Sequence, residues 1–110
     1  MNLRFSARLA LIVAISAFAS GVKAQTPDPS GGRKLAFDFC AGCHQVQQKT
    51  TEPSPNPDAP PFALVAATPS LTDLAIRVFL RSPHSSMPNF LLSDTDIDGI
   101  IAYLRTFHPE

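Results

Sequence analysis

Prolines crowd the middle of this chain of 110 residues and limit its possible folds more than any other feature. Of the eleven prolines, five fall between residues 53 and 61, and Pro69 follows shortly after. Proline lacks a backbone donor and fixes φ, so residues 45–61 are predicted to form a loop and neither a helix nor a central strand. A loop of this length in a small domain needs a reason, and we expect it to wrap over a ligand. Pro60-Pro61-Phe62 is the expected docking end of this loop.

The first 24 residues have the pattern of a secretory signal peptide. Two arginines precede an apolar run at residues 9–19, and the small-residue site Val22-Lys23-Ala24 follows it. We predict cleavage before Gln25, which leaves residues 25–110 as a single domain. An earlier cut and a retained membrane anchor are the alternatives, although the apolar run has about half of the roughly 20 residues that a spanning helix needs.

Removal of the signal peptide changes the charge balance. Six basic and nine acidic side chains remain in residues 25–110, for a formal net charge of −3 with neutral histidines. No basic patch survives that would bind nucleic acid, and an anionic membrane surface is not favoured either. A domain of this size has a limited core, so a bound group that fills the interior would help to stabilise it.

Apolar residues at helical spacing predict three main helices. The first covers residues 31–44 with Ser30 as its N-cap. The second starts near Thr68-Pro69, ends at Pro83 and has an apolar face of Leu71, Leu74, Ala75, Val78 and Phe79. The third is capped by Ser93, has Arg105 in its last turn, and buries Ile97, Ile100, Ile101, Leu104 and Phe107. No convincing strand pattern occurs, so the predicted fold is all-α with two long loops.

The only two cysteines belong to the motif Cys40-Ala41-Gly42-Cys43-His44. This Cys-x-x-Cys-His pattern is the signature of covalent attachment of haem c. Two thiols at this spacing can bond the two vinyl groups of a porphyrin, and the adjacent histidine then lies beneath the iron as an axial ligand. The alternatives are weaker, because a dithiol redox pair usually has a βαβ setting and a zinc site needs two more ligands at suitable spacing.

Together with this motif, other residues make the chain resemble the bacterial class I c-type cytochromes, which are small monohaem proteins. Gly32 matches the glycine at the helix crossing of that family, and Ile101-Ala102-Tyr103-Leu104 matches its terminal helix. The segment Pro83 to Pro88 resembles the loop that carries the methionine ligand. The resemblance covers residues 31–108 and implies the cytochrome c fold around one haem. In the family, a proline carbonyl orients the axial histidine, and several prolines here are candidates.

The resemblance makes Met87 the candidate for the sixth iron ligand. It is the only methionine that remains after signal removal, and it follows His44 by 43 residues, which is ample chain to reach the other face of a haem. A methionine that only fills a gap in the core is the alternative. His84 could ligate in its place, although a histidine at the surface near the haem edge is the simpler expectation. His108 is expected to be exposed.

Several other residues are expected to serve packing. Gly32 permits a close helix crossing covered by the ring of Tyr103, with Phe39 and Leu104 as further packing residues. Walls of the haem pocket are expected at Phe62, Phe79, Phe90 and Leu91.

The resemblance and the export signal imply a periplasmic carrier of single electrons that is not an enzyme. It would dock transiently with redox partner proteins and would be a monomer if free, with no nucleic acid partner and no membrane insertion after cleavage. The first alternative is a dedicated haem subunit of a larger dehydrogenase or oxidase complex. The second is a haem protein that reacts with peroxide or a gas after displacement of Met87, although no distal set of His and Arg is evident.

Overall fold

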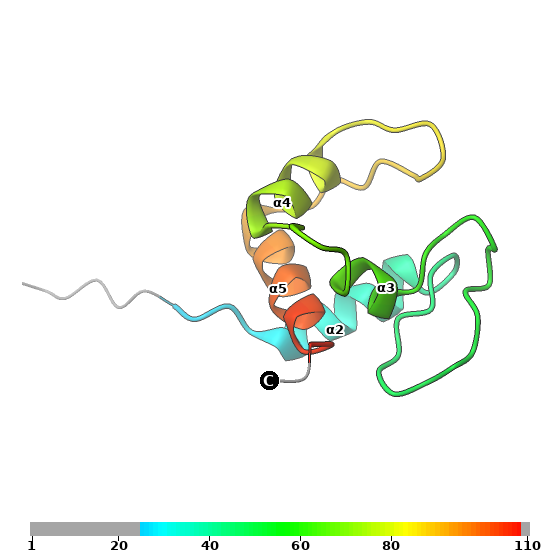
Figure 1. Cartoon of the computed structure of the whole chain (residues 1–110). Helices are drawn as coiled ribbons and strands as arrows, with labels where there is room; N and C mark the ends of the chain where they lie inside the picture. The colour runs from blue at the N-terminus through cyan, green and yellow to red at the C-terminus, as the bar shows by residue number, and fades with distance from the viewer. Residues whose placement is uncertain (1–24, 109–110) are drawn as a thin grey trace, which may run out of the picture.

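The computed structural model describes residues 25–108, and the predicted signal peptide (1–24) lies outside these residues. Helix α2 (Pro29–Leu35) continues into the π-type segment η2 (Ala36–Cys40), and α3 (Phe62–Ala66), α4 (Asp73–Arg81) and α5 (Asp94–Arg105) follow. No named strand occurs within residues 25–108. The prediction of an all-α fold with three main helices and long loops is confirmed. The short helix α3 was not predicted from the sequence. Figure 1 shows α5 between α2 and α4, with the loops before α3 and before α5 extending to the same side.

The first helix begins earlier and ends earlier than the sequence predicted. Its N-cap is Asp28, whose carboxylate accepts hydrogen bonds from the backbone N–H groups of Ser30 and Gly31. Pro29 follows at the first helical position, where its fixed φ suits a helix and its missing N–H costs nothing. Ser30 is therefore inside the helix, and the prediction of a Ser30 cap was wrong. After Cys40 the chain continues to His44 as a turn, closed by the His44 N–H donating to the Cys40 carbonyl at 2.8 Å.

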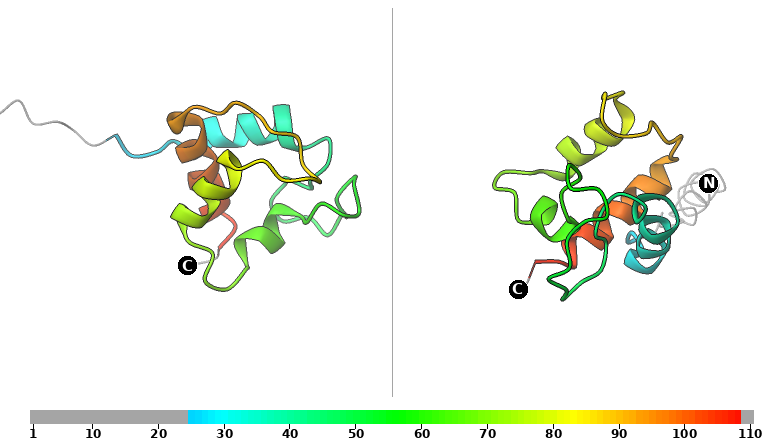
Figure 2. Two further views of the ribbon diagram at one scale, coloured as in Figure 1. Left: turned by 90° about the horizontal axis from the view of Figure 1, so that it is seen from above. Right: turned by 90° about the vertical axis from the view of Figure 1, so that its right-hand side faces the viewer.

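Helices α2 and α5 cross through two glycines. A Cβ placed on Gly32 would lie 1.8 Å from the carbonyl oxygen of Gly99 and 2.8 Å from the backbone N of Ile100. The backbones therefore touch, which only a residue without a side chain allows at this position. The expected close crossing at Gly32 is confirmed, but its nearest contacts are backbone atoms of Gly99 and Ile100 and not the ring of Tyr103. The two further views in Figure 2 show the same crossing of α2 and α5.

Helix α4 begins at Asp73 and not near Thr68. Thr72 is its N-cap, and the Thr72 hydroxyl accepts a hydrogen bond from the Ala75 N–H at 3.1 Å. The earlier start is excluded because Ser70 has a φ of 64°, which a right-handed helix cannot contain. The predicted end is confirmed, since the helix stops at Arg81 and Ser82 is extended before Pro83.

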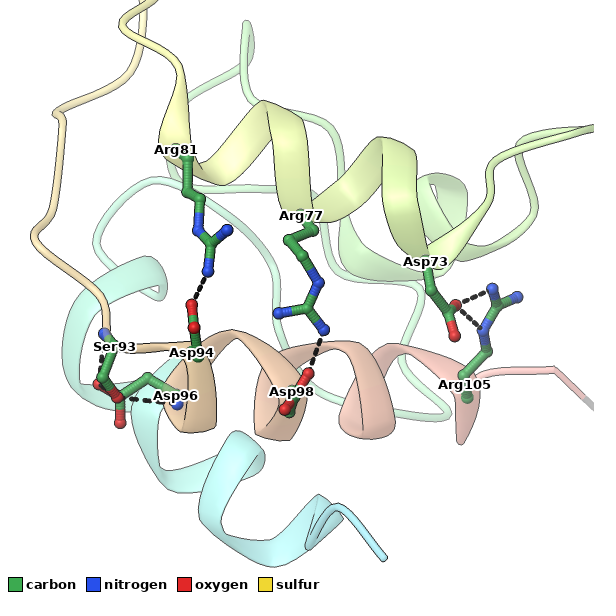
Figure 3. A network of polar contacts seen from close by, with 8 residues as sticks. All are labelled: Asp73, Arg77, Arg81, Ser93, Asp94, Asp96, Asp98 and Arg105. Carbon is green, nitrogen blue, oxygen red and sulfur yellow. Dashed lines mark hydrogen bonds and ion pairs between the residues drawn. The ribbon is translucent and has the colours of Figure 1, made fainter. Parts of the chain in front are cut away.

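Charged side chains line one edge of the contact between α4 and α5. Asp73, Arg77 and Arg81 recur every four residues and pair with Arg105, Asp98 and Asp94 of α5, as Figure 3 shows. This order makes the two helices antiparallel. The predicted apolar face of α4 was partly wrong, because Leu74 is 68% exposed and Val78 is 56% exposed, while Ile76 is buried. Ile76 packs in the core beside these pairs, and Leu74 and Val78 lie on the opposite, exposed side of α4.

Helix α5 supplies most of the core. Ile97, Ile100, Ile101 and Leu104 are buried as predicted, and Phe107 is half-buried against them. They pack with Tyr103 of the same helix and with Ala36, Val46, Phe62 and Ile76 from earlier parts of the chain. The Tyr103 hydroxyl donates to the backbone carbonyl of Val46 at 2.7 Å, which ties the start of the proline-rich loop to α5.

The start of α5 is fixed by a reciprocal cap. The Ser93 hydroxyl accepts from the Asp96 N–H, and the Asp96 carboxylate accepts from the Ser93 N–H and hydroxyl, as Figure 3 shows. The hydrogen bond from the Ser93 hydroxyl holds the pKa of Asp96 below its ordinary value of 3.8. The predicted Ser93 cap is thus confirmed.

Substitution Ser93→Ala is expected to lower the stability of the protein by about 1 kcal/mol at neutral pH, since an N-cap hydroxyl is lost. Because the pKa of Asp96 is lowered on folding, its stabilising effect is present above the ordinary pKa and is lost as the pH falls through the folded value. The difference between wild type and variant should therefore shrink on acidification below about pH 4. Urea unfolding at a series of pH values measures this, and a difference that grows toward low pH contradicts the prediction.

Candidate haem site

A cavity of about 410 Å³ opens between η2, the proline-rich loop, α3, α4 and the loop before α5. This volume lies in the range of protein sites for small organic groups. A smaller cavity of about 120 Å³ adjoins it and reaches Ile76, Ile100 and Leu104 of the core. Both cavities share the lining residues Phe39, Cys40, His44, Val65, Leu71, Phe79, Met87 and Phe90. The four residues predicted from the sequence to hold a haem, Cys40, Cys43, His44 and Met87, all line the larger cavity.

The two cysteines are not bonded to each other and lie at and just after the end of the first helix. Cys40 is the last residue of η2, where the Ala41 N–H reaches back to the Ala36 carbonyl at 2.9 Å. Burial raises the pKa of the Cys40 thiol above its ordinary value of 9.0. A thiol with a raised pKa stays protonated near neutral pH, unlike the attacking cysteine of a dithiol redox pair, whose pKa is lowered. The surroundings of Cys40 therefore lack the feature that activates the attacking cysteine of such a pair.

His44 is oriented by the proline-rich loop. Its Nδ1 lies 2.7 Å from the carbonyl oxygen of Pro60, and because a carbonyl can only accept, Nδ1 carries the proton. The other ring nitrogen, Nε2, then has the free lone pair that an iron ligand needs. The sequence left open which proline fills this role, and in the structure it is Pro60. The ring also packs edge-on against Phe62 at a centroid distance of 5.7 Å.

The loop that carries Pro60 is fastened to the motif by hydrogen bonds. The Asn56 N–H donates to the Cys43 carbonyl at 3.0 Å, and the Phe62 N–H donates to the Gln45 carbonyl at 2.9 Å. The Gln45 N–H in turn donates to the Ser54 hydroxyl at 3.0 Å. The predicted loop is confirmed, and its docking end is Phe62, which is 6% exposed and starts α3.

Met87 comes to the cavity from the loop between α4 and α5. Its partner across a tight turn is His84, with which it forms an isolated backbone bridge. Both side chains line the larger cavity. The cavity is therefore lined by the imidazole of His44, from the start of the proline-rich loop. It is also lined by the imidazole of His84 and the thioether of Met87, from the loop before α5. His108 is exposed, as expected.

The expected walls of the pocket were mostly correct. Phe79 and Phe90 line both cavities, and Phe62 lines the smaller one. The expectation that Leu91 forms a wall was wrong, because its side chain is 99% exposed. Its neighbour Leu92 packs instead against the core and lines the smaller cavity. Phe39 is a wall rather than a core residue, since it is 50% exposed and packs on Phe90 at a centroid distance of 5.7 Å. Leu64, Val65 and Leu71 also line the larger cavity, and the apolar run after Pro61 was the signal that could have found the first two.

The residues around the cavity fit a covalently attached haem. Two thiols, an imidazole with a free Nε2 and a thioether are the donors that such a group takes from a protein, and apolar side chains form most of the walls. Within residues 25–108 no three His, Cys, Asp or Glu side chains gather in a group that could hold a metal ion by itself. These features place the protein in the class that binds haem through a Cys-x-x-Cys-His motif.

Comparison with known proteins agrees with this class. The family model described as cytochrome c matches residues 30–108. The chain is also 35% identical over 101 residues to cytochrome c-552 of Bradyrhizobium diazoefficiens, and the match covers 92% of this chain and 93% of that protein. No solved structure matches the chain significantly. The chain belongs to the cytochrome c family. It is a haem-based electron carrier that binds covalent haem c, and the resemblance stated from the sequence is confirmed.

Proposed function

We propose that the mature protein is a periplasmic, class I cytochrome that transfers single electrons between redox partners, with His44 and Met87 as the axial ligands of its iron. The observation that carries this proposal is the meeting of both side chains at one cavity. His44 belongs to the attachment motif and Met87 comes from a loop 43 residues further along the chain.

When bound, the haem supplies a couple between ferrous and ferric iron that moves one electron at a time. The residues of the chain keep the ligand geometry constant. The Pro60 carbonyl fixes the ring of His44, and the thioether of Met87 favours the reduced iron, which raises the reduction potential. His44 and Met87 would together hold the iron from the chain, so that no substrate would need to bind and little of the chain would need to rearrange when one electron is transferred. Phe79 and Phe90 help to exclude water from the cavity.

The surroundings of Met87 support a carrier over a haem protein that reacts with peroxide. Such chemistry would use a cationic side chain free to assist at the distal side, and Arg81 is the nearest candidate in the sequence. Arg81 instead pairs with Asp94 of α5 and does not line the larger cavity. His84 does line it, from the same loop as Met87.

The proposed location rests on the signal pattern in residues 1–24 and on the oxidising, export-linked assembly expected for covalent haem. None of the helices within residues 25–108 is long and apolar enough to cross a membrane. The partners are proposed to be redox proteins that dock transiently near the haem edge. The exposed apolar side chains Leu74 and Val78 on α4 are the observation that keeps a subunit of a larger dehydrogenase or oxidase complex as the second candidate.

The optical spectrum of the exported holoprotein tests the proposal. His/Met ligation predicts a near-infrared charge-transfer band from thioether to ferric iron, and a sharp reduced α band that carbon monoxide leaves unchanged. Absence of the near-infrared band, or ready binding of carbon monoxide, would show that Met87 is not a firm ligand. The mass of the same sample should correspond to a chain that starts at Gln25 and carries one haem. Elution of the untagged protein as a monomer would favour the free carrier, and copurification with a dehydrogenase or oxidase would favour the subunit.

A further inference from the structure

Charged side chains are nearly absent from the segments that enclose the larger cavity. Of the residues that line this cavity, Asp58 is the only aspartate, glutamate, lysine or arginine. No such residue occurs in the attachment motif and its flanks (39–48), in residues 59–72 or in the loop before α5 (82–92). The opening of the cavity is therefore almost uncharged, although residues 25–108 contain six basic and eight acidic side chains.

Most of these charges form ion pairs elsewhere on the fold. Three arginine–aspartate pairs join α4 and α5, as Figure 3 shows, and Lys34 pairs with Asp38 on the first helix. Lys49 and Glu52 belong to the proline-rich loop, but they line neither cavity and have opposite signs. Because salt screens exposed charges within about 10 Å at 0.1 M, these side chains exert little force at the opening.

Two exposed segments meet at the opening of the cavity. Phe39, near the end of η2, packs on Phe90 of the loop before α5 at a centroid distance of 5.7 Å. Ser86 and Pro88 of that loop line the larger cavity and are exposed. Gly42 lies between the two cysteines and is exposed, and a Cβ placed on it would have no neighbour within 4 Å. We call Phe39, Gly42, Ser86 and Pro88 the mouth surface.

The mouth surface adjoins the edge of the cavity where a haem would carry no charge. Cys40 and Cys43 are the residues that would bond the two vinyl groups. A haem has its two propionates on the edge opposite its vinyl groups, so the propionates would point away from the attachment motif. Asp58 is then the one charge that the chain adds to the wall of the cavity.

We propose that the mouth surface docks a redox partner through an uncharged face of that partner, apolar at its centre, without steering by charge. This inference rests on the proposed electron transfer at the same site. A charged group brought against the mouth surface would lose hydration without gaining a counter-charge, which is unfavourable. In each encounter one electron leaves the donor and enters the acceptor, and no covalent bond forms or breaks.

Electron self-exchange between oxidised and reduced molecules of the exported holoprotein tests the inference. The probe is a second copy of the protein, whose own mouth surface is an uncharged face of the required kind. Broadening of nuclear magnetic resonance lines in mixed samples gives the rate constant. For the wild type we expect this constant to change less than about threefold between roughly 10 mM and 200 mM salt, because only the small net charge of each molecule is screened.

Charges introduced at Gly42 locate the docking surface. Gly42→Gln is the reference for side-chain size, and Gly42→Glu and Gly42→Lys add a charge of either sign. Both charged variants should exchange electrons at least about threefold more slowly than Gly42→Gln at low salt, because like charges then face each other across the contact. High salt should remove most of this difference.

The same three substitutions at Gly31 are the matched control. Gly31 is exposed in the first turn of α2, and a Cβ there meets only Asp28 Oδ2 at 3.6 Å. Gly31→Glu and Gly31→Lys alter the net charge as much as the Gly42 variants do, but they should stay within about twofold of the wild type. If the Gly42 variants do not mature, the series is made at Ser86, which is exposed at the same opening.

Two results would overturn the inference. In the first, lysine speeds and glutamate slows self-exchange equally at both glycines, which means that net charge governs the encounter. In the second, the charged Gly42 variants exchange as fast as Gly42→Gln at low salt, which means that molecules meet through another surface. Failure of the proposed function is seen separately, because the wild-type protein would then lack the near-infrared thioether band.

Discussion

Replacing both Cys40 and Cys43 with alanine is expected to leave the exported chain without retained haem and largely unfolded. The cavity that the haem is expected to occupy has a volume of about 410 Å³. At about 24 cal/mol per Å³, a closed cavity of this size would cost roughly 10 kcal/mol, which is an upper bound because this one opens to solvent. A domain of this length has a total stability of about 4–13 kcal/mol. This upper bound equals the whole stability of the fold, so even a part of it would leave little of that stability.

Two measurements check this prediction. The first is extraction with acidified acetone, which should leave haem on the wild-type chain and find none bound to the double variant, because only thioether bonds resist it. The second is far-ultraviolet circular dichroism of the double variant in neutral buffer, without extraction, which should show little of the helical signal of the wild type. A haem-free chain with the helical content of the wild type and a cooperative thermal transition would contradict the argument and show that the polypeptide core is sufficient.

Substitution Gly32→Ala is expected to lower the stability of the holoprotein by at least about 3 kcal/mol, or to prevent its accumulation. The added Cβ would lie 1.8 Å from the Gly99 carbonyl oxygen and 2.2 Å from the Gly99 carbonyl carbon. These are backbone atoms of α5 and cannot turn aside as a flexible side chain can, so the two helices must separate. The same separation would disturb the packing of Ala36 and Ile100 in the core.

The neighbouring glycine is the matched control. A Cβ on Gly31 would meet only Asp28 Oδ2, at an ordinary distance of 3.6 Å. Gly31→Ala should therefore be neutral or stabilise the protein by up to about 1 kcal/mol, since alanine favours helix over glycine. Thermal unfolding of both variants, followed by circular dichroism, measures the difference, expected to be about 12 °C or more for a domain of this size. Equal melting temperatures for the two variants would show that α2 and α5 can separate at little cost.

The surroundings of His44 and Met87 show how much of the candidate site could be predicted from the sequence. The attachment motif identified the cofactor and three of the four predicted site residues, since the chemistry of two thiols and a histidine at this spacing is local. It left open which proline orients His44, and the structure selects Pro60. That choice depends on how the loop folds back, which no spacing along the chain specifies. The lack of a hydrogen-bond partner for the buried Nε2 of His84 could not be predicted from the sequence either, because it depends on packing against Phe79 and on the turn at Met87.

The sequence by itself determined the features that depend on neighbours along the chain. Prolines excluded helix from residues 45–61, Ser93 capped the last helix, and the repeat of Ile97, Ile100, Ile101 and Leu104 marked its buried face. These outcomes follow from backbone geometry and helical period within a few residues.

The tertiary structure alone decided which surfaces meet. It placed Gly99 against Gly32, turned Ile76 inward and Leu74 and Val78 outward, exposed Leu91, and added arginine–aspartate pairs to the contact between α4 and α5. An apolar residue at helical spacing can face the core, a cavity or solvent, and the period alone does not distinguish them. The choice is made by contacts between segments distant in sequence, where backbone approach and charge pairing set how each helix is turned.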